Sequence, residues 1–185
     1  MEYIARKGGA ALFAFMVLTA FAGAGPAGTS GFPPSFSSWG MTKDAVLGRI
    51  IAPGTAVSEL SPRANPRYDN KIVNYLLSVN GALADNMTIV QAASTPARDY
   101  LFIRSRLMAV MERHGAISTA AFAEKLGAVM NVYGKPHIQH EGSTTSYSFS
   151  CEKTIVLVQI SKVEGNYECT MHYYARSIFR LLLTE

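Results

Sequence analysis

Residues 98–112, RDYLFIRSRLMAVME, decide the fold class of this chain. Side chains suited to the two faces of a strand alternate across Arg98–Ile103, and they alternate again across Leu107–Glu112. This two-residue periodicity is typical of β-strands. The short break at Arg104–Arg106 leaves room only for a tight turn. The stretch therefore predicts an antiparallel β-hairpin.

A second group of strands follows near the C-terminus. The segments Ser146–Ser150, Thr154–Ser161 and Asn166–Ala175 have strand composition and are separated by short polar breaks. Glu164-Gly165 is a turn signal between the last two of them. The sequence therefore predicts a three-stranded antiparallel meander.

Two segments upstream of the hairpin are predicted as the first strands. Met87–Ala92 has strand composition, and Lys71–Val79 is taken as a strand although its mixed pattern leaves a helix as an alternative. Asn80-Gly81 is a turn signal between them. The polar segments Ala52–Asn70 and His137–Thr145 are predicted as loops.

Two helices are predicted from their caps and their 3.6-residue periodicity. Thr42 can cap a short helix over Lys43–Ile51, and Ser118 can cap a longer one over Thr119–Tyr133. Ile178–Leu183 is predicted as a last short helix or strand. The apolar stripe of the longer helix comprises Phe122, Leu126, Met130 and Tyr133, with Val129 widening it.

This element order predicts an α+β fold. Strands joined by short turns form an antiparallel sheet, here the hairpin plus the C-terminal meander, and we expect two or three helices to pack on one of its faces. The expected organisation is a signal peptide over residues 1–24, a flexible Gly/Pro/Ser-rich lead-in over 25–38, and one globular domain over 39–185.

The first 24 residues have the three parts of an export signal. Arg6 and Lys7 make a positive start, Ala10–Phe21 is apolar, and Ala22-Gly23-Ala24 is a small-x-small cleavage site. The apolar run is about 12 residues, whereas a spanning helix needs about 20, so we expect cleavage rather than an uncut anchor. The predicted location is the periplasm or the medium.

Charge argues against nucleic acid as a partner. The leader carries one more basic than acidic residue, so its removal lowers the formal net charge from +4 to +3. Proteins that bind nucleic acid have a clearer basic stripe with aromatic side chains between the charges. We expect no nucleic-acid partner, no cofactor and no stable membrane span in the mature chain.

The two cysteines give conflicting signals. An exported protein with an even number of cysteines favours a disulfide between Cys151 and Cys169. The predicted meander sets Cys169 opposite Ile160, with Cys151 near the other end of the sheet, roughly 20 Å away. A disulfide needs Cα atoms within about 7 Å. The pairing is left open.

No catalytic motif is present, and the metal signal is weak. His137 and His140 are the candidate metal ligands for an exported metal-binding protein or hydrolase, but a third ligand is missing and solvated loop histidines are the simpler interpretation. Asp99 and Glu112 could be paired carboxylates, although a solvated strand face is the ordinary explanation. A small-ligand carrier with a pocket under the helix 119–133 is a third alternative.

Three short motifs carry a resemblance to a known group of proteins. Residues 39–46 (WGMTKDAV), 100–110 (YLFIRSRLMAV) and 133–136 (YGKP) resemble bacterial exported domains of the SmpA/OmlA (BamE) and beta-lactamase-inhibitor-like kind, and uncharacterised exported proteins of similar layout. That resemblance implies a non-enzymatic domain that binds other proteins through its sheet face. The chain lacks the cysteine that anchors the lipoprotein members.

The sequence thus predicts an exported, non-catalytic module that binds a protein or another partner of the cell envelope. Its partner surface is expected on the exposed face of the hairpin and meander. The candidate residues of that surface are Arg104, Arg106, Lys153, Gln159, Glu168 and His172.

Overall fold

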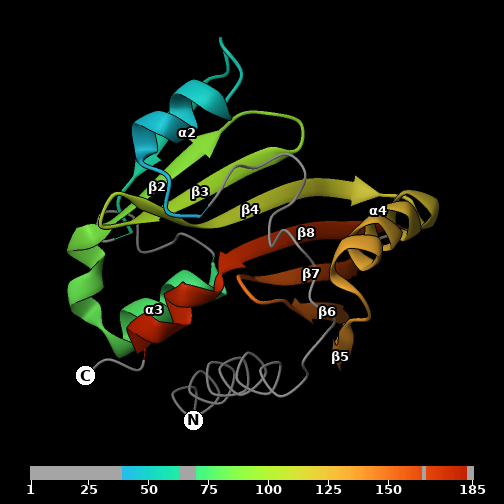
Figure 1. The fold of residues 1–185 in the computed structure, drawn as a ribbon. Helices are drawn as coiled ribbons and strands as arrows, with labels where there is room; N and C mark the ends of the chain where they lie inside the picture. The colour runs from blue at the N-terminus through green and yellow to red at the C-terminus, as the bar shows by residue number, and fades with distance from the viewer. Residues whose placement is uncertain (1–38, 63–69, 164–165, 183–185) are drawn as a thin grey trace.

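The computed structural model describes residues 39–62, 70–163 and 166–182 (Figure 1). The predicted signal peptide (1–24), the predicted lead-in (25–38) and the expected turn at Glu164-Gly165 lie outside these residues. Among the described residues, no helix has the length and apolar character needed to cross a membrane.

One antiparallel sheet of eight strands dominates the molecule. Its strand order is β1-β2-β3-β4-β8-β7-β6-β5, so the two halves of the chain meet where β4 pairs with β8. The strands are β1 (Val57–Leu60), β2 (Met87–Ala92), β3 (Ala97–Ile103), β4 (Arg106–Ile117), β5 (His137–Glu141), β6 (Thr144–Ser150), β7 (Thr154–Val163) and β8 (Asn166–Ala175).

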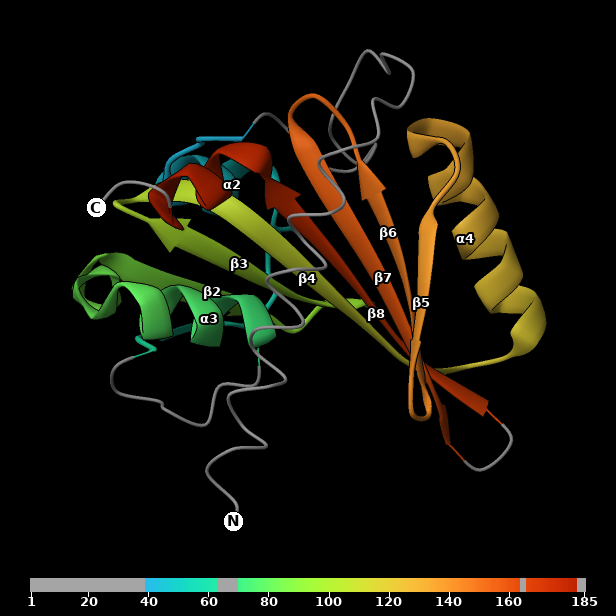
Figure 2. The ribbon, with the colours of Figure 1, turned by 90° about the horizontal axis from the view of Figure 1, so that it is seen from below.

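The predicted α+β arrangement, with helices packed on one face of the sheet, is wrong. Helices are few and short beside the sheet, and they pack against both of its faces. Figure 2 shows α3 alongside β2 and α4 alongside β5 and β6. In the described part of the chain, the helical segments are α2 (Lys43–Arg49), α3 (Lys71–Val79), α4 (Thr119–Tyr133) and two 3₁₀ segments, η2 (Gly81–Asn86) and η3 (Arg176–Leu182).

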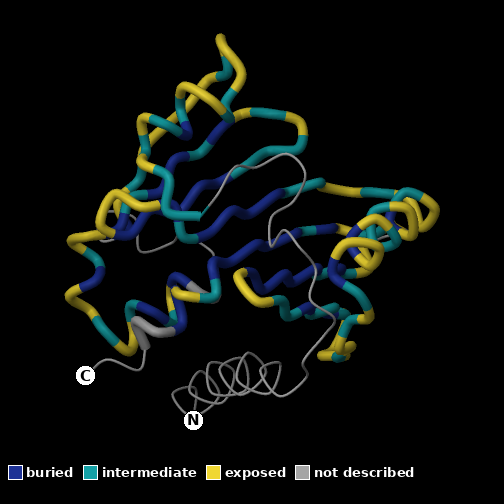
Figure 3. The backbone as a smooth tube through the Cα atoms, viewed as in Figure 1, coloured by how far each residue is buried: buried dark blue, intermediate teal, exposed yellow. Residues whose placement is uncertain are grey.

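The alternation of side chains along β7 defines the two faces. Val156, Val158 and Ile160 belong to a core that includes side chains of α2 and α4, and this side is called the α4 face. Ile155 and Leu157 belong to a second core with side chains of α3, η2 and η3, and this side is called the α3 face. The central strands are the most buried part of the fold, and β5 is largely exposed (Figure 3).

The chain contains two halves of similar layout. The first runs α2, β1, β2, β3, β4, with α3 and η2 inserted after β1, and the second runs α4, β5, β6, β7, β8. Each half begins with a capped helix on the α4 face: Thr42 accepts from the Ala45 N–H, and Ser118 accepts from the Ala121 N–H. Both predicted caps are confirmed, as are the hairpin and the meander strands.

The prediction of a strand over Lys71–Val79 is wrong, because this segment is the helix α3. Its alternative, a helix, is the observed structure. The side chain of Asn70 accepts a hydrogen bond from the Val73 N–H at 3.1 Å, which caps the first turn. Val73 and Leu76, three residues apart, are both buried on the sheet, as helical spacing requires.

Two predicted loops contain edge strands. The polar segment His137–Thr145 includes β5 and the start of β6, joined by the two-residue turn Gly142-Ser143. The segment Ala52–Asn70 includes β1, which pairs with β2. Both strands are short and mostly exposed, so they lack the apolar alternation that marks a buried strand.

Candidate functional site

A row of polar side chains crosses the α3 face from β2 to the edge strand β5. The register places these residues opposite one another on successive strands, except between β3 and β4, where Asp99 is opposite Met111 and Arg113 lies on the diagonal two residues further along. The row lies beyond the apolar area that α3 and η3 contact. Apart from Asp99 and Ser146, its residues retain solvent contact. This polar row consists of Gln91, Asp99, Arg113, Thr170, Gln159, Ser146 and Gln139.

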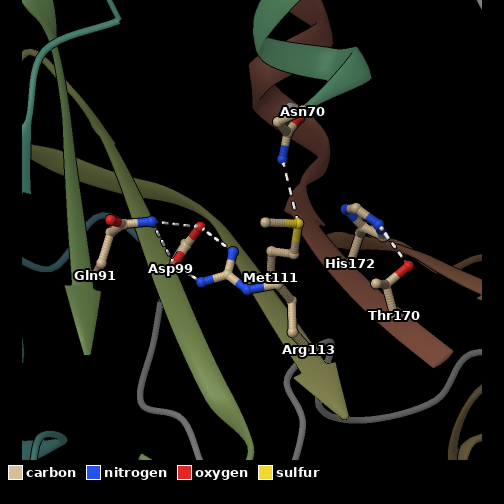
Figure 4. A network of polar contacts seen from close by, with 7 residues as sticks. All are labelled: Asn70, Gln91, Asp99, Met111, Arg113, Thr170 and His172. Atoms are coloured by element: carbon tan, nitrogen blue, oxygen red, sulfur yellow. Dashed lines mark hydrogen bonds and ion pairs between the residues drawn. The ribbon is translucent and has the colours of Figure 1, made fainter. Parts of the chain in front are cut away.

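A buried ion pair anchors the row (Figure 4). Asp99 is only 2% exposed, and its two carboxylate oxygens accept from the two terminal nitrogens of Arg113 at 2.5 and 2.7 Å. Gln91 Nε2 adds contacts to both oxygens at 3.3 Å. A buried carboxylate with such a two-pronged partner is held in one geometry. The part of the row on strands β2–β4 is therefore held in a fixed conformation.

On the β6–β8 side the row is built from neutral groups. Gln159 Nε2 donates to Ser146 Oγ at 3.2 Å, and Thr170 stands opposite Gln159. A second line of hydroxyls runs beside it, since Thr144 and Ser161 are hydrogen-bonded at 2.9 Å. Amides and hydroxyls at spaced positions offer both donors and acceptors to a partner.

His172 lies at the border between the polar row and the apolar part of the α3 face. Its Nε2 is 3.2 Å from Thr170 Oγ1, its Nδ1 is 3.0 Å from the Tyr174 hydroxyl, and its ring stacks on that of Tyr174. Burial raises the pKa of Tyr174. Both ring nitrogens are engaged and the residue is only 7% exposed. His172 therefore holds Thr170 and Tyr174 in place and does not itself form part of the accessible surface.

A second polar cluster lies on the α4 face. Arg98 Nε donates to Glu112 Oε1 at 2.8 Å, and His114 Nε2 lies 3.4 Å from Oε2. Burial alone would raise the pKa of Glu112, but the contacts with His114 and Arg98 outweigh it and lower that pKa. His114 reaches this side because the β4–β8 register shifts between Arg113 and Gly115, and a bulge re-aims a side chain.

The carboxylates of Asp99 and Glu112 are therefore not a pair, and their interpretation as a solvated face is wrong. They lie on opposite faces of the sheet, and both are buried. Each has its own arginine partner, Arg113 for Asp99 and Arg98 for Glu112. The sequence signal that could have found these pairs is the cross-strand spacing of opposite charges on a hairpin.

The two candidate metal ligands point away from each other. His137 and His140 are three residues apart on strand β5, and an odd spacing on a strand puts side chains on opposite faces. His140 Nδ1 is 3.0 Å from Thr145 Oγ1. Nowhere in the described ranges do three or more metal-binding side chains gather.

The two cysteines are free thiols at opposite ends of the meander. Cys169 pairs with Ile160 as expected, and Cys151 precedes Thr154, where β7 begins. Burial raises the pKa of Cys169 to about 11 and also raises that of Cys151, so neither is an activated nucleophile.

The candidate partner residues do not form one surface. Gln159, Glu168 and His172 share the α3 face by strand parity, although His172 is buried. Arg104 and Arg106 lie at the β3–β4 turn, where Arg106 Nη1 donates to the Gly40 carbonyl, and Lys153 lies in the β6–β7 turn. Along β4, Arg106 and Arg113 are seven residues apart, or roughly 23 Å. The sequence reasoning did not single out Arg113, Thr170 or Gln91.

The helix α4 fills the core with its inner stripe. The Phe122 ring packs near those of Tyr147 and Tyr167, and Tyr133 near Phe149. Met130, which was expected in the stripe, is 38% exposed. The side chains of the predicted stripe, under which a carrier pocket was considered, are therefore either packed in the core or exposed on the surface.

Comparison with protein families, with curated proteins and with solved structures finds no match for this chain.

Proposed function

We propose that this chain is an exported, non-catalytic module that binds a protein of the cell envelope through the polar row on the α3 face. The observation that carries the proposal is the row itself, a line of donors and acceptors across seven strands, fixed at one side by the buried Asp99–Arg113 pair. A rigid backbone surface with pre-positioned polar groups lowers the ordering cost of binding.

The β-sheet geometry also favours a macromolecular partner over a small molecule. The row extends across neighbouring strands that are spaced about 4.8 Å apart, so it is far longer than a metabolite. Small-molecule sites are concave and mostly apolar with a few convergent polar groups. A protein interface has a polar rim and about ten direct hydrogen bonds, and an extended polar surface of this kind supplies groups for both.

The experiment places a bulky charge in the row. Gln159→Arg and Thr170→Arg put a long side chain at two facing positions of β7 and β8, where both residues have solvent contact. Asn131→Arg, on an exposed position of α4, is the matched control on the other side of the sheet. The three variants carry the same added charge.

Proteins captured from an envelope fraction by the wild-type chain would be identified and then titrated as purified proteins. We expect both row variants to lose at least tenfold in affinity, since a disrupted central contact typically costs about 2 kcal/mol or more. The Asn131→Arg control should bind like the wild type. Equal affinity of all three variants would show that the row is not the interface.

A further inference from the structure

Among the described residues, strand β5 pairs only with β6 and forms one edge of the sheet, and the directions of its backbone groups follow from its turn. Glu141 and Thr144 flank the two-residue turn Gly142-Ser143, in which Gly142 has φ +58°. In such hairpins the flanking pair is hydrogen-bonded, and bonded pairs then alternate along the ladder. The N–H and C=O groups of Glu141, Gln139 and His137 therefore point to β6.

The backbone groups of Ile138 and His140 point away from the sheet. No turn, loop or cap hydrogen bond within the described ranges uses the backbone groups of these two residues. Three of the usual protections of a sheet edge are missing here, because the strand has no lysine, no internal proline and no bulge in its register with β6. Ile138 is also the most exposed large apolar side chain of the described residues, at 50%.

We propose that β5 pairs antiparallel with β5 of a second copy of this chain, centred on Gln139, to form a two-fold dimer with one continuous sheet. In this register the outward groups of Ile138 face those of His140 in the other copy. His137 stands opposite the other copy's Glu141, so an imidazole N–H can donate to a carboxylate. Gln139 stands opposite itself, where two amides can pair.

Neighbouring registers are poorer because hydrogen-bonded pairs must join outward-facing residues. A dimer centred on Ile138 would place His140 opposite Pro136, which has no N–H to donate. A dimer centred on His140 would place Ile138 opposite Gly142, which belongs to the turn. Only the register centred on Gln139 lets both outward residues bond and also opposes His137 to Glu141.

The other edge of the sheet lacks this self-complementarity. Strand β1 has four residues, and its Glu59 is engaged by Lys43 of α2 at 2.9 Å. In the β5 dimer the two-fold axis is perpendicular to the sheet, so the polar rows of both copies lie on one side. The dimer stands independently of the proposed partner binding, and it would present two binding rows at once.

Cysteine cross-linking tests the register directly. In a Cys151→Ser background, Gln139→Cys should form a disulfide-linked dimer under mild oxidation. Gln139 and its copy form a non-hydrogen-bonded pair, whose Cα atoms lie about 4.5 Å apart, within the range that a disulfide spans. Ile138→Cys alone is the matched control and should not cross-link. Ile138→Cys mixed with His140→Cys should cross-link as a heterodimer. Mass under non-reducing conditions measures each product.

Charge reversal gives a second test of the register, in a chain that keeps both of its native cysteines. Glu141→Lys should weaken dimerisation in sedimentation equilibrium by roughly tenfold, because it affects two symmetry-related pairs. His137→Glu combined with Glu141→Lys should restore it, while Glu152→Lys in an exposed turn should have no effect.

Two results would overturn the dimer. One is a wild-type chain that stays monomeric at concentrations up to about 1 mM, where even a weak contact is populated. The other is equal cross-linking of Gln139→Cys and Ile138→Cys, which would mean random collision or another register. Loss of partner binding with an intact dimer would leave this inference standing.

Discussion

The carboxylate of Asp99 is stabilised by its ion pair with Arg113 rather than by hydration. Its side chain is nearly inaccessible, and both oxygens are bound by Arg113, whose own side chain is 39% exposed. A buried carboxylate that loses its partner remains desolvated and unpaired. Removing one partner should therefore lower the free energy of unfolding by more than the intact pair contributes to it.

We expect Arg113→Gln to lower the free energy of unfolding by about 3 kcal/mol, at the lower end for a broken buried pair because Arg113 is partly exposed. Asp99→Asn with Arg113→Gln should recover part of this loss, since no charge is then left buried. Denaturant unfolding of the single and double variants measures both values. A double variant as unstable as the two losses added together would argue against a coupled pair.

Glu112 makes stability depend on acid pH. Its folded-state pKa lies below the ordinary value of 4.5, so its contribution is fully present above that pH and is lost as pH falls through the lowered pKa. We expect the stability difference between wild type and Glu112→Gln to shrink below about pH 4.5. The same measurement on the exposed Glu124→Gln should show a small difference at every pH. A wild-type advantage that persists at low pH would contradict this.

At the scale of elements, each half of the chain starts with a helix whose first turn is capped by a hydroxyl. The Ser118 side chain accepts from the Ala121 N–H at 3.2 Å, and α4 then carries Phe122, Val129 and Tyr133 onto the sheet. The cap thus fixes where the helix begins and which side chains reach the core.

Ser118→Ala should destabilise the protein by about 1 kcal/mol, the usual cost of losing a cap. Ser118→Asp keeps an acceptor at the same position and places a negative charge near the helix N-terminus, so it should retain wild-type stability. Thermal or denaturant unfolding distinguishes the two. Equal losses in both variants would mean that the serine acts through something other than its cap.

The predictions that held at the element scale depend on local signals. Caps, two-residue periodicity and short turns are read within about ten residues, and the hairpin, the meander and α4 follow them. Lys71–Val79 was misassigned because apolar residues at helical and strand spacing coincide over so short a segment. The decisive feature, the Asn70 cap, was overlooked inside an assumed loop.

At the scale of the whole molecule, the centre of the sheet joins the two halves. Strand β4 pairs with β3 and β8, and β8 pairs with β4 and β7, so both have bonded neighbours on each side. Strands β1 and β5 each have one described neighbour. Local stability should therefore fall from the centre to the edges.

Hydrogen exchange should show this gradient. Amides of β4 and β8 are expected to exchange only through global unfolding, and those of the edge strands β1 and β5 fastest among the strands because their opening costs few buried contacts. Exchange of β5 should slow at high protein concentration if the edge pairs with a second copy. Uniform protection across all eight strands would contradict the gradient.

The sequence by itself determined the local structure: the caps at Thr42 and Ser118, the 98–112 hairpin, the meander register that sets Cys169 opposite Ile160, and the apolar stripe of α4 apart from Met130. These depend on side chains close along the chain. Only the tertiary structure decided that helices cover both faces, that Asp99 and Glu112 face opposite ways, and that β5 forms an edge. Each of these depends on which strands pair across the sheet, and pairing between distant segments leaves no periodic trace in the sequence.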